Sequence, residues 1–109
     1  MPELTAAQIS VLQRLAAHGF SIVAFPLYAS AIGVRRSSFA ALLVPIEGGS
    51  LRLLGDACYL IDGNLSVRVT RKGRAIFIWK SREVEATPEL LAELGRFSAE
   101  VSGLLLPVT

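Results

Sequence analysis

The segment from residue 58 to residue 81, CYLIDGNLSVRVTRKGRAIFIWKS, contains two turn signals that separate three runs rich in branched and aromatic residues. The turn signals are Asp62-Gly63-Asn64 and Lys72-Gly73, whose glycines accept the positive φ angles that tight hairpins require. Runs of this composition between such turns are typical of β-strands. The segment therefore predicts an antiparallel β-meander, and its last two strands hold many of the aromatic and basic side chains.

The second hairpin has a definite register if Lys72 and Gly73 are its two loop residues. One face is then aliphatic. The other face places Arg68 opposite Phe77 and diagonal to Trp79, where a cation–π contact is feasible. The aliphatic face needs a cover from the first helix or from a second subunit. The expected cross-strand pairs are Arg71 with Arg74, Val69 with Ile76, and Val67 with Ile78.

A helix is expected at the N-terminal end of the chain. Thr5 can cap the amide of Gln8 while the Gln8 side chain reaches back, which is the pattern of a capping box. The helix should run to about His18, where Gly19 supplies a left-handed stop. His18 is expected to be a helix-end residue and not a catalyst. The face expected to be buried holds Ile9, Leu12, Leu15 and Ala16.

A second helix is expected to begin at Thr87-Pro88 and to reach about Val101, because proline needs no amide partner in a first helical turn. We expect residues 103–109 to be irregular. If this helix lies across the meander, it covers Phe77 and Trp79 and makes them part of the core. Its apolar stripe is formed by Leu90, Leu91, Leu94, Phe97 and Val101.

Strands are also expected between the first helix and the meander, at residues 21–28, 39–46 and 50–54. Residues 39–46 are almost wholly apolar, as expected of a strand that is covered on both faces. Taken together, the patterns predict a single α+β domain over residues 1–109, with an N-terminal helix, an antiparallel β-meander of about 4–5 strands and a C-terminal helix packed on the sheet.

Residues 25–44 leave an alternative open, because they resemble the skeleton of a helix-turn-helix. Gly33 would form the turn, residues 37–44 the recognition helix, and the hairpin at 71–74 the wing of a winged helix. Arg35 and Arg36 could then hold the nucleic-acid backbone. Such a recognition helix would offer mostly small side chains to the base edges, and the same residues also make a good buried strand. Those side chains are Ser37, Ser38, Ala40, Ala41 and Val44.

The chain is more apolar than an ordinary soluble domain. Apolar residues make up 52% and charged residues 18%, against typical values of about 45–50% and about 25%. A folded monomer of this mass has roughly 5,900 Å² of accessible surface, so a self-association patch of about 800 Å² per subunit is reasonable. We therefore expect a homodimer or another protein partner.

The net charge of +2 is unevenly distributed. Residues 35–82 hold nine lysines or arginines and three acidic residues, a local charge of +6. An anionic partner would meet this region and not the terminal helices. The same charges also suit a solvated sheet rim that is protected against aggregation.

The residues for common catalytic and metal sites are scarce. The chain has one histidine and one cysteine, Cys58, which we expect to be a small buried apolar residue and not a nucleophile. We expect no catalytic residue, cofactor or metal. The uncharged run 19–34 has 16 residues, fewer than the roughly 20 that span a bilayer. The N-terminus has no signal-peptide pattern, so the cytoplasm is the expected location.

These observations favour a non-catalytic interaction module that self-associates through an apolar sheet or helix surface. Nucleic-acid binding by a winged-helix-like domain is the alternative, and an enzyme with its site at a dimer interface ranks third. The candidate contacts to a partner or to nucleic acid are Arg35, Arg36, Arg68, Arg71, Lys72, Arg74, Phe77 and Trp79.

Overall fold

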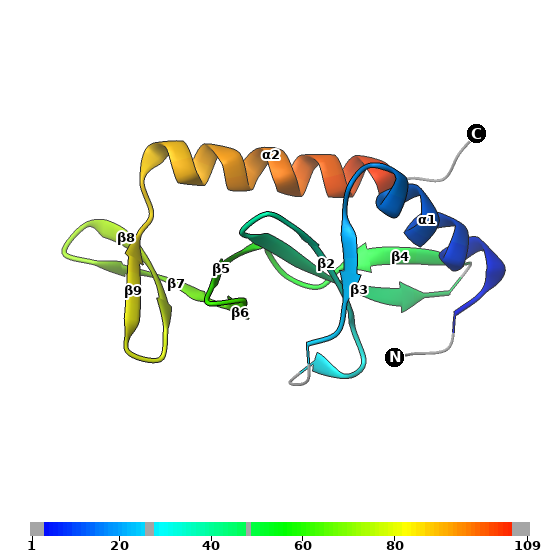
Figure 1. Ribbon diagram of the computed structural model, residues 1–109, viewed down its shortest axis with the longest axis horizontal. Coiled ribbons are helices and arrows are strands. Elements are labelled where there is room, and N and C mark those ends of the chain that lie inside the picture. Colours follow the sequence, from blue (N-terminus) through cyan, green and yellow to red (C-terminus); the bar gives the residue numbers. More distant parts are fainter. Residues whose placement is uncertain (1–3, 26–27, 48, 106–109) are drawn as a thin grey trace.

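The computed structural model describes residues 4–25, 28–47 and 49–105. A helix lies near each end of the chain and the strands lie between them, so the predicted α+β architecture is confirmed (Figure 1). In chain order the elements are α1 (Ala6–Ala17), β1 (Ser21–Val23), β2 (Ile32–Arg36), β3 (Phe39–Ile46), β4 (Ser50–Leu53), β5 (Cys58–Ile61), β6 (Asn64–Leu65), β7 (Val67–Arg71), β8 (Arg74–Trp79), β9 (Arg82–Glu85) and α2 (Pro88–Leu105).

Helix α1 begins with the predicted capping box. The backbone amide of Gln8 donates to the Thr5 hydroxyl at 3.2 Å, and the amide of Thr5 donates to the Gln8 side chain at 2.9 Å. His18 is the C-cap, and Gly19 follows with φ +87°. Both helix boundaries follow from local chemistry, because capping groups satisfy amides and carbonyls that have no partner within the helix.

The predicted buried face of α1 is right in part: Leu15 is buried and Leu12 packs on the core, but Ile9 and Ala16 are exposed. Gln8, Val11 and Leu15 are buried, whereas Ile9 is 44% exposed. The reason is a polar contact: the Gln8 side-chain amide donates to the carbonyl of Ser50 at 3.0 Å and to that of Ile46 at 3.4 Å. A buried glutamine with its hydrogen bonds satisfied anchors this face of the helix to the β3–β4 hairpin.

Strand β3 is the centre of the first sheet, whose order is β1-β2-β3-β5-β6, with β4 also paired to β3. Residues 40–43 of β3 are buried, so the prediction of a strand covered on both faces is confirmed. The strand expected over residues 21–28 is shorter and ends at Val23.

The helix-turn-helix alternative for residues 25–44 is wrong. Strands β2 and β3 are antiparallel, with Val34 opposite Ala41. They are joined by a tight turn in which Ser37 has φ +56°. Branched and apolar side chains in this segment favour paired strands over a helix. No recognition helix exists at residues 37–44.

The predicted meander is divided between two sheets. Strands β5 and β6 belong to the first sheet, whereas β7, β8 and β9 form a second one. The division falls at Ser66, whose amide and hydroxyl both donate to the Tyr59 carbonyl, at 3.2 Å and 2.6 Å. The described residues contain nine strands, more than expected, because strands β2 and β9 and the bend at Ser66 lack strong sequence signals.

Helix α2 lies along both sheets (Figure 1). The Leu90 amide donates to the Thr87 hydroxyl at 3.1 Å, which caps the start as expected. The helix continues to Leu105, so the expected irregular tail is wrong for residues 103–105, and residues 106–109 lie outside the described part. Its buried side chains are Leu94, Phe97 and Val101.

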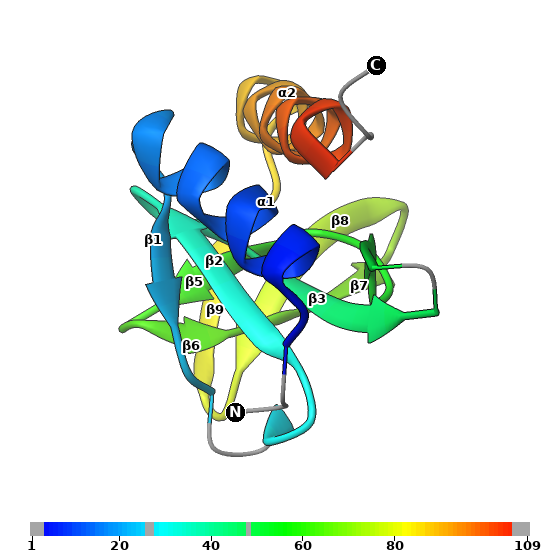
Figure 2. The same ribbon diagram turned by 90° about the vertical axis from the view of Figure 1, so that its right-hand side faces the viewer.

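A row of aromatic rings connects the helices with both sheets. Its successive centroid distances are 5.6, 5.9, 6.0 and 5.2 Å, within the 4.5–7 Å range of favourable ring pairs. The row therefore joins the second sheet to the main core. Both helices lie on the same side of the strands (Figure 2). In spatial order, the rings are Phe20, Phe97, Phe39, Tyr59 and Phe77.

None of the helices in the described residues is long and apolar enough to cross a membrane.

Candidate interaction surface

Strands β7, β8 and β9 are connected by two-residue loops. The first loop is Lys72-Gly73, with φ +53° and +75°, and the second begins at Lys80, with φ +53°. Positive φ at both positions of the first loop defines a type I′ turn, which matches the twist of the strands. The predicted register is confirmed, because the cross-strand pairs are Arg71 with Arg74, Val69 with Ile76, and Val67 with Ile78.

The inner face of this second sheet packs against the rest of the protein. Phe77 is 2% exposed and its ring lies 5.2 Å from that of Tyr59. Trp79 is half-buried against the core. The cation–π contact that the described residues make with Trp79 comes from Lys80, at 4.9 Å, and not from Arg68. The two aromatic residues therefore pack in and against the core.

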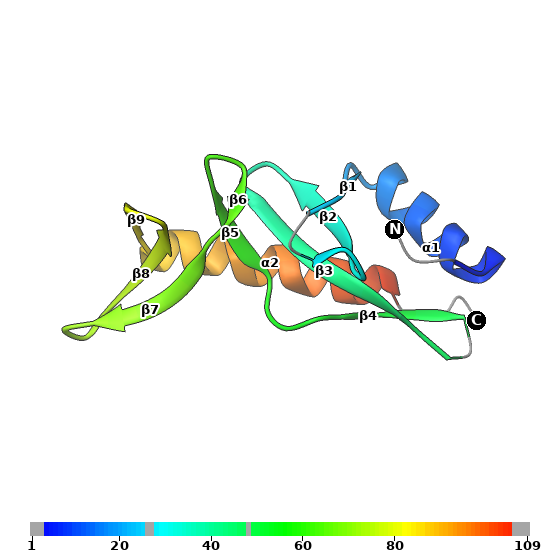
Figure 3. The same cartoon turned by 90° about the horizontal axis from the view of Figure 1, so that it is seen from below.

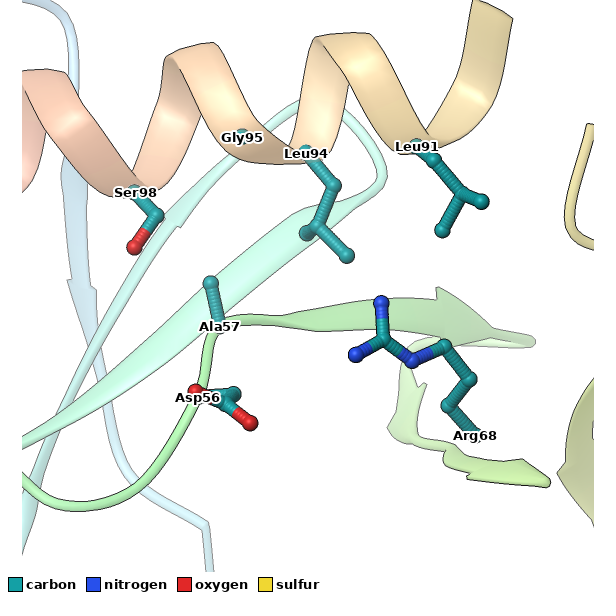
Figure 4. Close-up of a pocket in the computed structure, with 7 residues that line it drawn as sticks. All are labelled: Asp56, Ala57, Arg68, Leu91, Leu94, Gly95 and Ser98. Carbon is teal, nitrogen blue, oxygen red and sulfur yellow. The ribbon is translucent and has the colours of Figure 1, made fainter. Parts of the chain in front are cut away.

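Arg68 lies on the same inner face but is exposed. It borders an open pocket of about 170 Å³ under α2. Figure 4 shows the guanidinium end of Arg68 pointing toward the helix, opposite Leu91 and Leu94. Asp56 and Gly95 also line this pocket, and its volume is below the 300–1,000 Å³ of ordinary small-molecule sites.

The outer face carries the aliphatic side chains of the hairpin. Val67 is 64% exposed, and it is the most exposed large apolar residue of the described chain. Val69, Ile76 and Ile78 are half-buried. In the cross-strand register these residues form two adjacent aliphatic pairs on one face. We call this group, Val67, Val69, Ile76 and Ile78, the aliphatic patch.

Two ion pairs lie beside the aliphatic patch. Arg71 contacts Glu83 at 3.0 Å, and Arg74 is hydrogen-bonded to Glu85. That hydrogen bond raises the pKa of Arg74. All four side chains share the outer face with Ile76 and surround a shallow hollow next to it. The positive charge expected at the hairpin tip is thus partly neutralised, and the Lys72 loop residue remains exposed.

Sequence reasoning missed the two glutamates, because strand β9 was not expected. A weak signal existed: residues 82–85, Arg-Glu-Val-Glu, alternate a branched residue with charged ones, and the preceding residues can form a turn. Only the pairing with β8 places Glu83 opposite Ile78 and Glu85 opposite Ile76.

The other two candidate arginines lie on β2, in the first sheet, away from the hairpin (Figure 1). Arg36 stacks on the Phe20 ring at 4.2 Å and is ion-paired with Glu100, where its hydrogen bond lowers the pKa of Glu100. Arg35 donates to the Ser37 carbonyl at 3.1 Å. Arg36 thus connects β2 with α2, and the candidate contacts do not form one continuous basic surface.

The described residues contain no group of three or more histidine, cysteine or acidic side chains placed to hold a metal ion. Burial, and secondarily the negative charge of Asp56, raises the pKa of the Cys58 thiol. A raised pKa disfavours the thiolate, which is the reactive form. His18 forms the C-cap of α1 through its backbone, in agreement with its expected place at the helix end.

No protein-family model matches the chain, and comparisons with curated proteins and with solved structures found no match either.

Proposed function

We propose that this chain is a non-catalytic interaction module that self-associates through its β7–β8–β9 sheet. The observation that carries the proposal is the aliphatic patch. Within it, the exposed Val67 adjoins three half-buried aliphatic side chains, so the patch presents contiguous apolar surface. Contiguous apolar surface marks interaction sites, whereas single exposed apolar residues are ordinary.

The positions of the helices support this proposal. Helix α1 packs against β1, β4 and α2, at the end of the molecule opposite to β7–β9 (Figure 1). Helix α2 lies over the inner face, where Leu91 and Leu94 border the same pocket as Arg68. Within the described part of the chain, the outer face of the second sheet therefore has no helix over it.

The charges around the aliphatic patch favour a second copy as the partner. The outer face holds Arg71, Arg74, Glu83 and Glu85, so both signs are present in equal number. Such a face does not select a strongly acidic or strongly basic partner. In a two-fold symmetric contact the same patch serves both subunits.

The size of the face indicates a modest affinity. A standard interface uses about 20–30 residues on each side, and the outer face of three short strands supplies fewer. We therefore expect a dissociation constant in the micromolar range, which corresponds to a binding free energy of roughly 8 kcal/mol.

Two matched variants test the proposal. Val67→Arg places a charge in the aliphatic patch, whereas Ile9→Arg places one at an exposed apolar position on α1, which is 44% exposed. We expect Val67→Arg to weaken self-association by at least about tenfold, equivalent to about 1.4 kcal/mol, and Ile9→Arg to leave it unchanged. Sedimentation velocity over a concentration series measures both. Equal association of the two variants and the parent would contradict the proposal.

Nucleic-acid binding is the less favoured alternative. Arg71 and Arg74 already have acidic partners, and the segment 37–44 offers no recognition helix. If the hairpin bound phosphates, oligonucleotide affinity would fall steeply with salt and would be lost when Arg71, Lys72 and Arg74 are changed to alanine. We expect no retention of oligonucleotides even at low salt.

A further inference from the structure

The β7 strand is an edge of the second sheet, whose order is β7-β8-β9. It lies at the margin of the molecule in the view from below (Figure 3). The type I′ loop closes on the pair Arg71 and Arg74, which in such hairpins exchanges both backbone hydrogen bonds. Hydrogen bonding then alternates along the strand. The backbone groups of Val69 and Val67 are also hydrogen-bonded to β8, while those of Arg68 and Thr70 point away from β8.

We propose that β7 pairs edge to edge with β7 of a second copy of this chain, antiparallel and centred on Val69. The proposal rests on the self-association proposed above and specifies its geometry. An unpaired edge with free amides and carbonyls is a template for another strand. Pairing about a two-fold axis at Val69 uses the outward groups of Arg68 and Thr70 in both copies, with one hydrogen-bonded pair on each side of the axis.

The side chains of β7 select this register. Centred on Val69, the pairing places Arg68 opposite Thr70 of the second copy and Val69 opposite Val69. If the two-fold axis moves to Arg68, Arg68 lies opposite Arg68 of the second copy. If it moves to Thr70, Arg68 lies opposite Lys72 of the second copy. Like charges directly opposite each other destabilise a sheet, so the sequence Val-Arg-Val-Thr-Arg is self-complementary at one register.

The other edge of the sheet is a poorer candidate. By the same alternation, the outward backbone groups of β9 belong to Glu83 and Glu85. Pairing β9 with itself about Val84 would place Glu83 opposite Glu85 of the second copy. Two such contacts between carboxylates are unfavourable. The chain also continues from β9 into α2 within a few residues.

The pairing covers the most exposed part of the aliphatic patch. Val67 would lie opposite Arg71 of the second copy, whose aliphatic stem can pack on it. Val69 would contact Val69 across the axis. The β7–β8–β9 sheets of the two copies would then join into one continuous sheet. The isoleucines of both copies would lie on the same face of it.

Cysteine crosslinking tests the register directly. In a Cys58→Ser background, Val69→Cys places two thiols in a pair that is not hydrogen-bonded, with Cα atoms about 4.5 Å apart, at the lower limit of the 4.4–6.8 Å disulfide range. Val67→Cys is the matched control, because its two copies would be about 13 Å apart along the strands. Under mild oxidation, we expect Val69→Cys to form a covalent dimer at least about ten times faster than Val67→Cys.

A second pair of variants removes the hydrogen bonding without relying on cysteine. Thr70→Pro deletes an amide that points away from β8, and proline is tolerated on an edge strand in that orientation. Thr70→Val keeps the amide. Both variants should show the parent's circular dichroism spectrum, but Thr70→Pro should sediment as a monomer at concentrations where Thr70→Val dimerises.

The outcomes separate the two proposals. If reduced Val69→Cys protein dimerises but crosslinks no faster than Val67→Cys, edge pairing at this register is wrong while self-association stands. If the parent and the reduced variants remain monomeric throughout, self-association itself is wrong. Equal dimerisation of Thr70→Pro and Thr70→Val would also overturn edge pairing.

Discussion

At the scale of single residues, two glycines show opposite constraints. A Cβ atom added at Gly33 would lie 2.6 Å from a ring carbon of Phe25 and 2.7 Å from the carbonyl oxygen of Val23. Both distances are far below van der Waals contact, and the carbonyl belongs to the paired strand β1. At Gly95, inside α2, an added Cβ would meet no atom within 4 Å. Strand β2 thus requires glycine, whereas α2 does not.

The two glycines give a matched prediction. Gly33→Ala should lower the free energy of unfolding by about 1–3 kcal/mol through overpacking. Gly95→Ala should raise it by about 1 kcal/mol, because alanine has the higher helix propensity. Urea unfolding followed by circular dichroism measures both. Loss of stability in Gly95→Ala, or none in Gly33→Ala, would contradict the packing described around β1, β2 and α2.

Cys58 gives a pH-dependent prediction. Burial is the larger cause and Asp56 the smaller cause of its raised pKa, so the thiolate appears at higher pH in the folded protein than in the unfolded chain. The pH at which iodoacetamide alkylation is half-maximal should therefore be higher for the native protein than for the same protein in urea. Asp56→Asn should move the native midpoint downward, and an unchanged midpoint would show that Asp56 has no effect.

At the scale of elements, the start of α1 combines a local cap with a long-range anchor. Gln8 completes the capping box with Thr5 and also donates to two carbonyls of the β3–β4 hairpin. The local part was predictable, because the residues lie three positions apart in the sequence. The long-range part was not, because it depends on where a strand some forty residues later is placed.

Removal of the cap should have a measurable effect on stability. Thr5→Ala should lower the free energy of unfolding by about 1 kcal/mol, since it leaves an amide of the first turn without its partner. Ser10→Ala, at an exposed position in the same helix, is the control and should be nearly neutral. Thermal unfolding compares the two, and equal melting temperatures would mean that the box contributes nothing.

In the second sheet, too, the sequence predicts local features but not contacts between elements. The register of the β7–β8 hairpin was predictable, because Lys72-Gly73 fixes it locally. The division of the meander at Ser66 and the burial of Phe77 against Tyr59 were not. They arise from contacts between elements. The ion pairs of Arg71 and Arg74 were missed for the same reason, since both depend on strand β9.

At the scale of the whole molecule, α2 and the aromatic row hold the second sheet against the main core by its inner face. The outer face and the β7 edge are left at one end of the molecule, far from α1 (Figure 1). An apolar face with mixed charges and an unpaired edge strand together favour association with a second copy. We therefore expect the protein to self-associate.

The most direct test is the molar mass of the unmodified protein in solution, measured by light scattering from low to high micromolar concentration. The chain mass is 11.7 kDa. If the chain self-associates, the measured mass rises with concentration toward twice this value. A mass that stays at 11.7 kDa over the whole range would contradict it.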